Sequence, residues 1–545
     1  MTPSFAQRCG IDDAARAAAV IEVARRIREE GIELVRIAWC DLHGVLRGKT
    51  LVAGAGVDAL ASGVGMVSTL MLKDTSDRTT YKVFEPGLAA AQPGFAFANN
   101  LLLLPDPASF RVLPWAEATG WMQAQPWFED GTPVEIDTRR VLQHALARLR
   151  EAGYGLKCGL EVEFHIYRID AGVADPSLDP MRAAWPGEPP PVTMIHPGYN
   201  LLAEGWSDLA DEPLRIVQRT AQGLGLPLRS LEIELGPSQV EAVFDATDAL
   251  TAADQMVLFR NGVRQALRRA GYHATFVCRP PFPNVMASGW HLHQSLVDAQ
   301  TGRNSFCRDA PAAGTSTADA QHTLSAAGEH WLAGLLAHAR GMAALCTPTI
   351  NGYGRYRPNA LAPQSVLWGR DNRGALLRVL GGCGDAATRI ENRIGEPSAN
   401  PYLYIAAQIH AGLDGIVRSL GAGKATNAPY ADPAAARADV AASRTESVSR
   451  TDSAVPRMEL AASHAEAAGS ATGSPTQAAH AGPSTSLPTG LGPALDALAA
   501  DAALTQAFGP RLIDCFTRAK RSELARHDQA EDRDVWQRCE YFSRL

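Results

Sequence analysis

Four separated segments of this 545-residue chain alternate polar and apolar residues. They are residues 159–167 (GLEVEFHIY), 231–235 (LEIEL, continuing to Gln239 and Glu241), 290–296 (WHLHQSL) and 389–393 (RIENR). Because side chains of a strand alternate between its two faces, each segment predicts a strand with acidic, imidazole or guanidinium groups on one face. Asn392 interrupts the apolar face of the last segment. The pattern predicts a sheet with one strongly polar face.

These polar faces have two interpretations. Any one of them fits an antiparallel strand with a solvated face. Taken together, they carry Glu and His instead of the mixture of Lys, Glu and Thr that a solvated face usually has. Carboxylates within ~4 Å of each other repel by about 4 kcal/mol per pair at an effective dielectric near 20, so converging faces need cations. Oxygen-rich ligand sets with one His suit Mg²⁺ or Mn²⁺, and we expect such a site on a curved sheet.

Length, charge and cysteine usage restrict the class of protein. A chain of 545 residues exceeds one ordinary domain. The net charge of -7 gives no reason to expect a nucleic acid or an anionic membrane as partner. The nine cysteines form no CxxC pair, which argues against a disulfide framework or a zinc finger. With no signal sequence and no apolar run of membrane-spanning length, we expect a cytoplasmic protein.

The chain predicts an α+β protein with two domains, residues 1–128 and 129–545. The first has a helix followed by a hairpin whose turn is residues 41–44, and the second alternates strands and helices. Residues 434–485 are dominated by Ala, Ser, Thr, Gly and Pro, so we expect a disordered insertion there. Helices are expected at residues 11–30, 138–152, 212–223, 252–270, 492–508 and 510–527.

The same segments resemble the motifs of the glutamine synthetase family, whose members use ATP to join glutamate and ammonia. The resemblance runs from about residue 39 to 416 and resumes at 487, and the insertion has no counterpart. Four motifs carry it in order: 161–163 (EVE), 234–241 (ELGPSQVE), 288–293 (SGWHLH) and 389–402 (RIENRIGEPSANPY). The resemblance implies a β-grasp-like N-terminal domain, a catalytic domain with a curved antiparallel sheet, and a ring-shaped homo-oligomer with active sites between subunits.

The resemblance also implies ATP as co-substrate and two or three Mg²⁺ or Mn²⁺ ions per site. By position, one ion has the ligands Glu163, Glu234 and Glu241. The second ion has the ligands Glu161, His291 and Glu391. The nucleotide-binding positions are His293, Ser295, Arg373, Arg378 and Arg389. In the implied reaction glutamate takes the γ-phosphate of ATP to form an acyl phosphate, which an amine then attacks, and cations stabilise the transferring phosphoryl group.

The substrate side of the implied site has fewer matches. Arg355 resembles the arginine that binds the carboxylate of the substrate, and Arg393 resembles a catalytic arginine that grips the reacting carboxyl. Arg373 resembles a catalytic arginine that, with Arg378, lies near the phosphates. Tyr199 resembles a tyrosine of the amine site, which Glu234 borders. Asp41 resembles an aspartate that a neighbouring subunit contributes to accept the proton of the amine. From local sequence alone, Asp41 is equally an ordinary turn residue.

Two departures from the family affect the substrates. Glutamine synthetases proper carry a flap glutamate six residues after the arginine that Arg355 matches, and this chain has Leu361 there. The change removes an anion and a proton acceptor and offers apolar surface, which favours an alkyl or aromatic amine over ammonium. Met286 and Ala287 replace a usual Asn-Gly on the loop that contacts glutamate. Neutral drift of variable loops is the alternative explanation of both changes.

The leading hypothesis is therefore an ATP-dependent ligase that forms γ-glutamyl amides from glutamate and an organic amine. The first alternative is glutamine synthetase proper, which uses ammonia. The second is a catalytically inactive relative with a structural or regulatory role. The complete set of six implied metal ligands argues against the second alternative, because an idle site would leave clustered carboxylates that repel one another.

Overall fold

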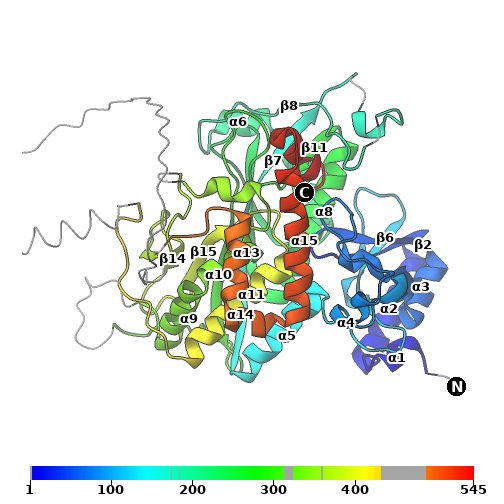
Figure 1. Ribbon diagram of the computed structural model, residues 1–545, viewed down its shortest axis with the longest axis horizontal. Coiled ribbons are helices and arrows are strands. Elements are labelled where there is room, and N and C mark those ends of the chain that lie inside the picture. The colour runs from blue at the N-terminus through cyan, green and yellow to red at the C-terminus, as the bar shows by residue number, and fades with distance from the viewer. Residues whose placement is uncertain (1–2, 173–174, 183, 312–322, 358–359, 431–485) are drawn as a thin grey trace, which may run out of the picture.

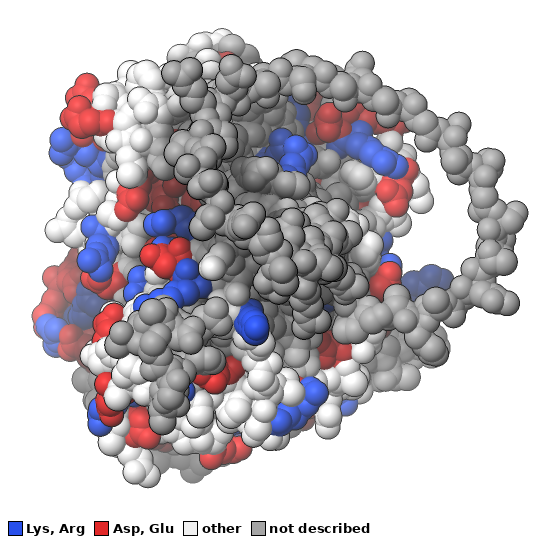
Figure 2. All heavy atoms as spheres, turned by 90° about the vertical axis from the view of Figure 1, so that its left-hand side faces the viewer, with Lys and Arg blue, Asp and Glu red and all other residues white. Residues whose placement is uncertain are grey.

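The computed structural model describes residues 3–172, 175–182, 184–311, 323–357, 360–430 and 486–545 (Figure 1). The expected insertion at 434–485 lies outside the described residues. Within these ranges, no helix combines the length and the apolar character that crossing a membrane requires. Lys and Arg side chains lie interspersed with Asp and Glu on the face that Figure 2 shows.

The N-terminal part is built on a six-stranded sheet (Figure 1, blue). The strand order is β2 (Leu46–Val52), β1 (Leu34–Cys40), β6 (Thr119–Trp127), β4 (Asn100–Pro105) and β3 (Val64–Val67), with β5 (Arg111–Val112) beside β6. β1 is antiparallel to β2 and parallel to β6, as a β-grasp-like fold requires. The helices are α1 (Phe5–Arg8), α2 (Ala14–Glu29), α3 (Ala53–Ser62) and α4 (Gly87–Ala91). The domain boundary expected at residue 128 stays a prediction.

A nine-stranded sheet forms the centre of the larger part. Its order is β13 (Trp368–Arg370), β14 (Leu377–Leu380), β15 (Arg389–Gly395), β12 (Trp290–Asp298), β7 (Tyr154–Ile169), β10 (Gln239–Asp248) and β9 (Leu228–Ile233). The short strands β8 (Val192–Met194) and β11 (Tyr272–Thr275) pair with β7. All neighbours are antiparallel except β13 and β14. The expected α+β class with a curved antiparallel sheet is confirmed.

Helices cover the apolar face of this sheet. They are α5 (Thr138–Glu151), α6 (Glu204–Leu209), α7 (Asp211–Gly223), α8 (Ala249–Arg269), α9 (Ala326–Ala337), α10 (Ala339–Cys346) and α11 (Pro401–Val417). α5 and α8 contact β7, and α11 packs against α5, α8 and α9. A Cβ atom on Gly334 of α9 would lie only 2.1 Å from the carbonyl oxygen of Ala411 in α11. The backbones of α9 and α11 are therefore in direct contact at this point. The helices cover one face of the sheet, and the polar face carries the candidate site.

The helix expected at 492–508 is two helices. α13 (Leu491–Ala500) ends at Asp501, which caps α14 (Ala502–Phe508) through its side chain. Asp501 also lies 2.7 Å from Nδ1 of His338, whose Nε2 lies 2.8 Å from Asp414. Burial lowers the pKa of His338, but the two carboxylates outweigh it and raise the pKa above its ordinary value. His338 thus joins three helical segments. α15 (Pro510–Asp528) and α16 (Arg533–Gln537) follow, and the π-helical turn η6 (Arg538–Phe542) comes directly after α16.

Candidate active site

Strand register brings the predicted metal ligands together. β7 lies between β10 and β12, and β15 lies beside β12. Three cross-strand pairs result: Glu241 opposite Glu163, His291 opposite Glu161, and His293 opposite Glu391. Directly opposite residues have Cβ atoms about 4.5–5.5 Å apart, so the first two pairs place two predicted ligands side by side, and the third places His293 beside the ligand Glu391. Five of the six predicted ligands lie on these strands, and Glu234 follows directly after the end of β9.

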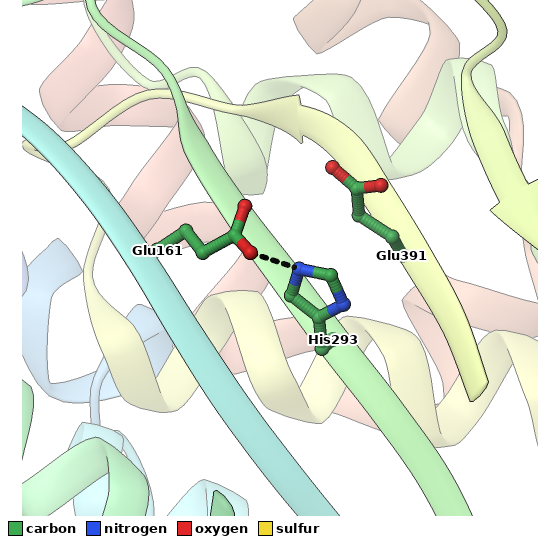
Figure 3. Close-up of side chains that lie close together, drawn as sticks. All are labelled: Glu161, His293 and Glu391. Atoms are coloured by element: carbon green, nitrogen blue, oxygen red, sulfur yellow. Dashed lines mark ion pairs between the residues drawn. The ribbon is translucent and has the colours of Figure 1, made fainter. Parts of the chain in front are cut away.

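The donor atoms form two overlapping groups. One group is Glu161, His293 and Glu391, and the other is Glu161, Glu241 and His291, with all donor atoms of a group within 4.8 Å of one another. Figure 3 shows the first group, contributed by three neighbouring strands. Nε2 of His293 lies 3.0 Å from Glu161. His293, expected at the nucleotide, thus also lies among the ligand atoms.

The electrostatics of these groups fit divalent cations. Burial and the neighbouring Glu234 raise the pKa of Glu163 to about 7. Burial and Glu163 raise the pKa of Glu241 to about 10, and its buried Oε1 has no hydrogen-bond partner among the described residues. Burial lowers the pKa of His291 to about 4, which keeps the imidazole in its neutral, ligating form. A divalent cation would displace the protons of Glu163 and Glu241 and would provide a partner for the unbonded Oε1 of Glu241.

A glutamine that the sequence did not single out holds one of these carboxylates. Nε2 of Gln239 donates to Oε2 of Glu163 at 3.1 Å and to the Ser288 hydroxyl at 3.0 Å. The backbone N–H of Gly289 donates to the same Glu163 oxygen at 2.8 Å. The signal was present in the sequence, because Gln239 and Glu241 alternate on one strand face.

Two arginines fix Glu391. Nη1 of Arg378 donates to its Oε2 at 3.0 Å, and Nη1 of Arg393 donates to its other oxygen. Burial opposes ionisation of Glu391, but Arg393 and the nearby imidazoles lower its pKa to about 2. Although fully buried, Glu391 is therefore ionised at neutral pH. Arg373, which was expected beside Arg378, lies exposed on a turn.

Arg355 is buried and already engaged by the protein. Its Nη1 donates to the carbonyl oxygen of Arg393 at 2.8 Å, and its Nη2 lies 3.4 Å from Nε2 of His291. These contacts place the guanidinium at the edge of the ligand cluster. Because these contacts use N–H groups of Arg355, fewer of them are left to bind the carboxylate of a substrate.

A cavity of about 640 Å³ opens beside the cluster. Glu161, His293, Ser295 and Arg389 are among its lining residues. Nε of Arg389 donates to Nδ1 of His293 at 3.1 Å, and this orients Nε2 towards Glu161. Three of the five predicted nucleotide-binding residues therefore line one cavity that reaches a metal ligand. Arg373 and Arg378 are not among the lining residues.

Two loops carry the predicted amine-site and glutamate-site residues. The hydroxyl of Tyr199 donates to the carbonyl oxygen of Asn284, and its backbone N–H donates to Leu235 at 2.6 Å. Met286 packs on Gly236, where an added Cβ would lie 2.8 Å from the Cβ of Met286. The carbonyl oxygen of Ala287 accepts a hydrogen bond from Gln239 at 3.4 Å. Both loops therefore adjoin the segment that holds Glu234.

Leu361 lies beside Arg393. Its backbone has a φ of 50°, and its side chain is 56% exposed. Nη2 of Arg393 donates to its carbonyl oxygen at 3.0 Å. The position of the missing flap carboxylate thus presents an exposed apolar side chain next to the arginine that also binds Glu391.

Asp41 lies outside this cluster and caps its own turn. Its buried carboxylate accepts hydrogen bonds from the backbone N–H groups of His43 at 2.9 Å and Val45 at 3.0 Å, and from Nε of Arg47 at 2.7 Å. Burial would raise its pKa, but Arg47 and the other donors outweigh burial and lower it. The turn interpretation of Asp41 is therefore sufficient within one chain, and a role at a neighbour's site stays a prediction.

Comparisons with known proteins show which proteins this chain resembles. The family pattern described as "Glutamine synthetase, catalytic domain" matches residues 135–471. A γ-glutamylanilide synthase from Acinetobacter sp. is 35% identical over 96% of this chain and 95% of its own. A glutamate–isopropylamine ligase from Pseudomonas sp. is 30% identical over 74% of this chain and 82% of its own. The solved structure of a GmaS/ADP complex superposes with a TM-score of 0.67 at 26% identity, covering 95% of this chain and 98% of that one.

Proposed function

Because the chain belongs to the glutamine synthetase family, a group of ligases that form carbon–nitrogen bonds, we propose that it joins glutamate to an organic amine at the expense of ATP. The product is a γ-glutamyl amide, with ADP, phosphate and a proton released. Two of the similar proteins named above act on organic amines, aniline in one and isopropylamine in the other, by their names. The observation that carries the proposal is Leu361 at the position of the flap glutamate, beside Arg393.

The proposed roles follow the geometry. The residues that would hold two or three Mg²⁺ or Mn²⁺ ions are Glu161, Glu241, His291 and Glu391, whose donor atoms lie close together with those of His293. Glu163 and Glu234 join them by their motif positions and by the effect of Glu234 on the pKa of Glu163. Such ions neutralise charge on the transferring phosphoryl group. Ser295 and Arg389 line the nucleotide cavity. Arg393 orients the reacting carboxyl of glutamate, and Arg355 supports it. Tyr199, Met286 and Ala287 border the substrate pocket.

Between alkyl and aromatic amines, the site favours an aromatic one. Ammonium and alkylamines are cations at neutral pH, so a base must remove a proton before they attack. Arylamines are uncharged at neutral pH because the ring delocalises the nitrogen lone pair. Leu361 offers no base. Burial would raise the pKa of Asp41, but Arg47 and two backbone N–H groups lower it, so that Asp41 from a neighbouring subunit would be a weak base. A neutral arylamine can attack first and lose its proton after the C–N bond has formed.

An ADP-release assay with glutamate, Mg²⁺ and a panel of amines tests the proposal. The panel contains ammonium, ethanolamine, isopropylamine and aniline, and mass spectrometry identifies each amide. We expect kcat/KM for aniline to exceed that for ammonium by at least about tenfold, a difference of about 1.4 kcal/mol. Turnover with ammonium alone would establish glutamine synthetase proper. Failure to bind Mg²⁺ and nucleotide in calorimetry would establish an inactive relative.

A further inference from the structure

An arginine of the candidate active site, Arg393, bonds the segment that carries Leu361. Nη2 of Arg393 donates to the carbonyl oxygen of Leu361, while Nη1 of the same guanidinium binds the metal-ligand candidate Glu391. The neighbouring Ala362 is buried. Arg393 therefore connects residues 361–365 to the ligand cluster, because it bonds both Leu361 and Glu391.

Tyr430 holds this segment from the other side. Its hydroxyl donates to the carbonyl oxygen of Ala362 at 3.2 Å. Its ring lies against the turn at Gly374, where an added Cβ would come within 3.0 Å of the ring. Burial raises the pKa of Tyr430 and the guanidinium groups of Arg393 and Arg355 oppose that rise, so the phenol lies within electrostatic range of both.

The chain returns to the same segment at residue 486. Ser486 forms an antiparallel bridge with Ser365, and the backbone N–H of Leu487 donates to the carbonyl oxygen of Gln364 at 3.1 Å. Leu487 is buried in the main core, which fixes this contact. Residues 361–365 are thus bonded at Leu361 by Arg393, at Ala362 by Tyr430, and at 364–365 by residues 486–487.

We propose that Tyr430 is a positioning residue that keeps the Leu361 segment seated over Arg393, so that water does not reach the acyl phosphate before the amine does. The inference rests on the proposed function for its chemistry. Tyr430 supplies the bond nearest to Leu361 after Arg393 itself, and Arg393 is also needed at Glu391. Without the tyrosine, the segment keeps the bond from Arg393 to Leu361 and the distant bonds at 364–365, but it loses the second bond beside Leu361.

Two substitutions separate the hydroxyl from the ring. Tyr430→Phe removes the hydrogen bond to Ala362 and keeps the packing on Gly374, whereas Tyr430→Ala removes both. The measurement is the ratio of ADP released to amide formed, together with KM for the amine and for ATP. Tyr154→Phe, at the start of β7, is the matched control for loss of a tyrosine hydroxyl.

We expect Tyr430→Ala to raise the ratio of ADP to amide by about fivefold or more, because one net hydrogen bond is worth about that factor and the packing is lost as well. KM for the amine should rise by a similar factor, and KM for ATP should stay within about twofold. Tyr430→Phe should give an intermediate ratio. Tyr154→Phe should match wild type.

A wild-type ratio and a wild-type amine KM in Tyr430→Ala, at an unchanged melting temperature, would overturn the inference. If that variant does not fold, a wild-type ratio in Tyr430→Phe has the same force. Failure of the proposed function is seen separately, in the wild-type protein, as absence of amide from organic amines. The ratio is then measured with ammonium, so the role of Tyr430 is decided in either case.

Discussion

Glu391 and Glu241 are carboxylates of one cluster with opposite proton affinities. Two arginines keep Glu391 ionised with a pKa of about 2, whereas burial and a neighbouring carboxylate raise the pKa of Glu241 to about 10. Without cations, Glu241 therefore holds a proton at neutral pH, whereas Glu391 does not. The ionised carboxylate anchors the site, and the protonated ones mark where positive charge is needed.

Metal affinity should consequently depend on pH. Glu163 and Glu241 hold protons near neutral pH because their pKa values are about 7 and about 10, and a cation must displace these protons. Lower pH favours the protonated form, so Mn²⁺ binding should weaken by about tenfold or more from pH 8 to pH 6. Calorimetry in buffers of different ionisation enthalpy measures both the affinity and the protons released. A dissociation constant that is constant over this range would contradict the assignment, and Glu163→Gln should release fewer protons.

Leu361→Glu should shift the enzyme towards ammonium. The carboxylate would restore an anion and a proton acceptor beside Arg393, and we expect the ratio of kcat/KM for ammonium to that for aniline to rise by about tenfold or more. Leu361→Gln has the same shape without the charge and should not produce this shift. The coupled ADP-release assay compares both variants. Equal ratios in the two would show that Leu361 does not discriminate between amines.

The sequence predicted part of the ligand cluster, because alternation fixes the face of a strand and the family motifs indicate its neighbours, but it did not predict that Arg373 is exposed or that Asp41 lies outside the cluster. The meeting of Glu161, His291 and Glu391 follows from these patterns. Hydrogen bonds across loops leave no such periodic signal. The backbone bonds of Arg355 and the contact of Tyr430 with Ala362 therefore came only from the structure.

At the scale of elements, close helix packing supports the sheet from behind. The backbones of α9 and α11 meet at Gly334 and Gly415, and a Cβ on Gly415 would lie 2.1 Å from the carbonyl oxygen of His330. No side chain fits between them. The spacing of these helices is therefore set by two glycines and transmitted to the strands that they cover.

Gly334→Ala should destabilise the protein. The added methyl group overlaps the backbone of α11, which forces the helices apart and reduces the free energy of unfolding by about 1–3 kcal/mol. Thermal unfolding monitored by circular dichroism measures the loss. The matched control is Gly54→Ala in α3, where no atom lies within 4 Å, and it should be neutral or stabilising by up to about 1 kcal/mol. Equal melting temperatures for the two variants would refute this account of the packing.

His338 makes the anchoring of the C-terminal helices depend on pH. Its folded-state pKa is raised, so its contribution to stability is complete below the unfolded value of about 6.5 and is lost as pH rises through the folded value. His338→Gln should reduce the free energy of unfolding by about 2 kcal/mol near pH 6 and by less at higher pH. Denaturation by urea at a series of pH values tests this. A difference between variant and wild type that grows with pH would have the wrong sign.

Sequence patterns located most helices and strands, but they did not explain the two residues that interrupt the patterns, Asn392 and Asp501. Asn392 interrupted the expected apolar face. In the structure its side chain is buried, and its amide donates to Gln408 of α11 at 2.7 Å, so this polar residue bonds the sheet to a helix. The helix expected at 492–508 breaks at Asp501, because that residue caps the next helix and binds His338. Both exceptions depend on partners far away in the chain, which local periodicity does not reveal.

At the scale of the whole molecule, the chain carries the nucleotide cavity and the ligand cluster, whereas Asp41 lies outside that cluster. We propose the ring-shaped homo-oligomer that the family implies, in which Asp41 of one subunit approaches the site of the next. The turn at residues 41–44 is bonded to the catalytic part, since Asn400 at the start of α11 donates to the carbonyl oxygen of Asp41 at 2.9 Å. The small sheet is thus tied to the catalytic part at this turn.

Mixed oligomers test this arrangement. Glu391→Gln keeps an acceptor for Arg378 and Arg393 and should abolish phosphoryl transfer in a protein that still folds, and Asp41→Ala should lower amide formation. If a site combines Glu391 from one subunit with Asp41 from its neighbour, random mixing of the two variants gives about a quarter of the sites both residues intact. Co-expression should therefore restore activity above the mean of the two separate variants. Activity equal to that mean would place both residues in the same subunit or exclude Asp41 from the site.

The longest strand of the molecule, β7, is sixteen residues long and pairs with four other strands. It supplies Glu161 and Glu163, so groups proposed to activate the acid lie on a strand with several paired neighbours, whereas Tyr199 and Leu361, which are proposed to border the amine, lie on loops. Acyl activation and choice of nucleophile can accordingly be altered one without the other. A biocatalyst for new amides could be obtained by exchanging the loops alone, with the scaffold of the phosphoryl chemistry left untouched.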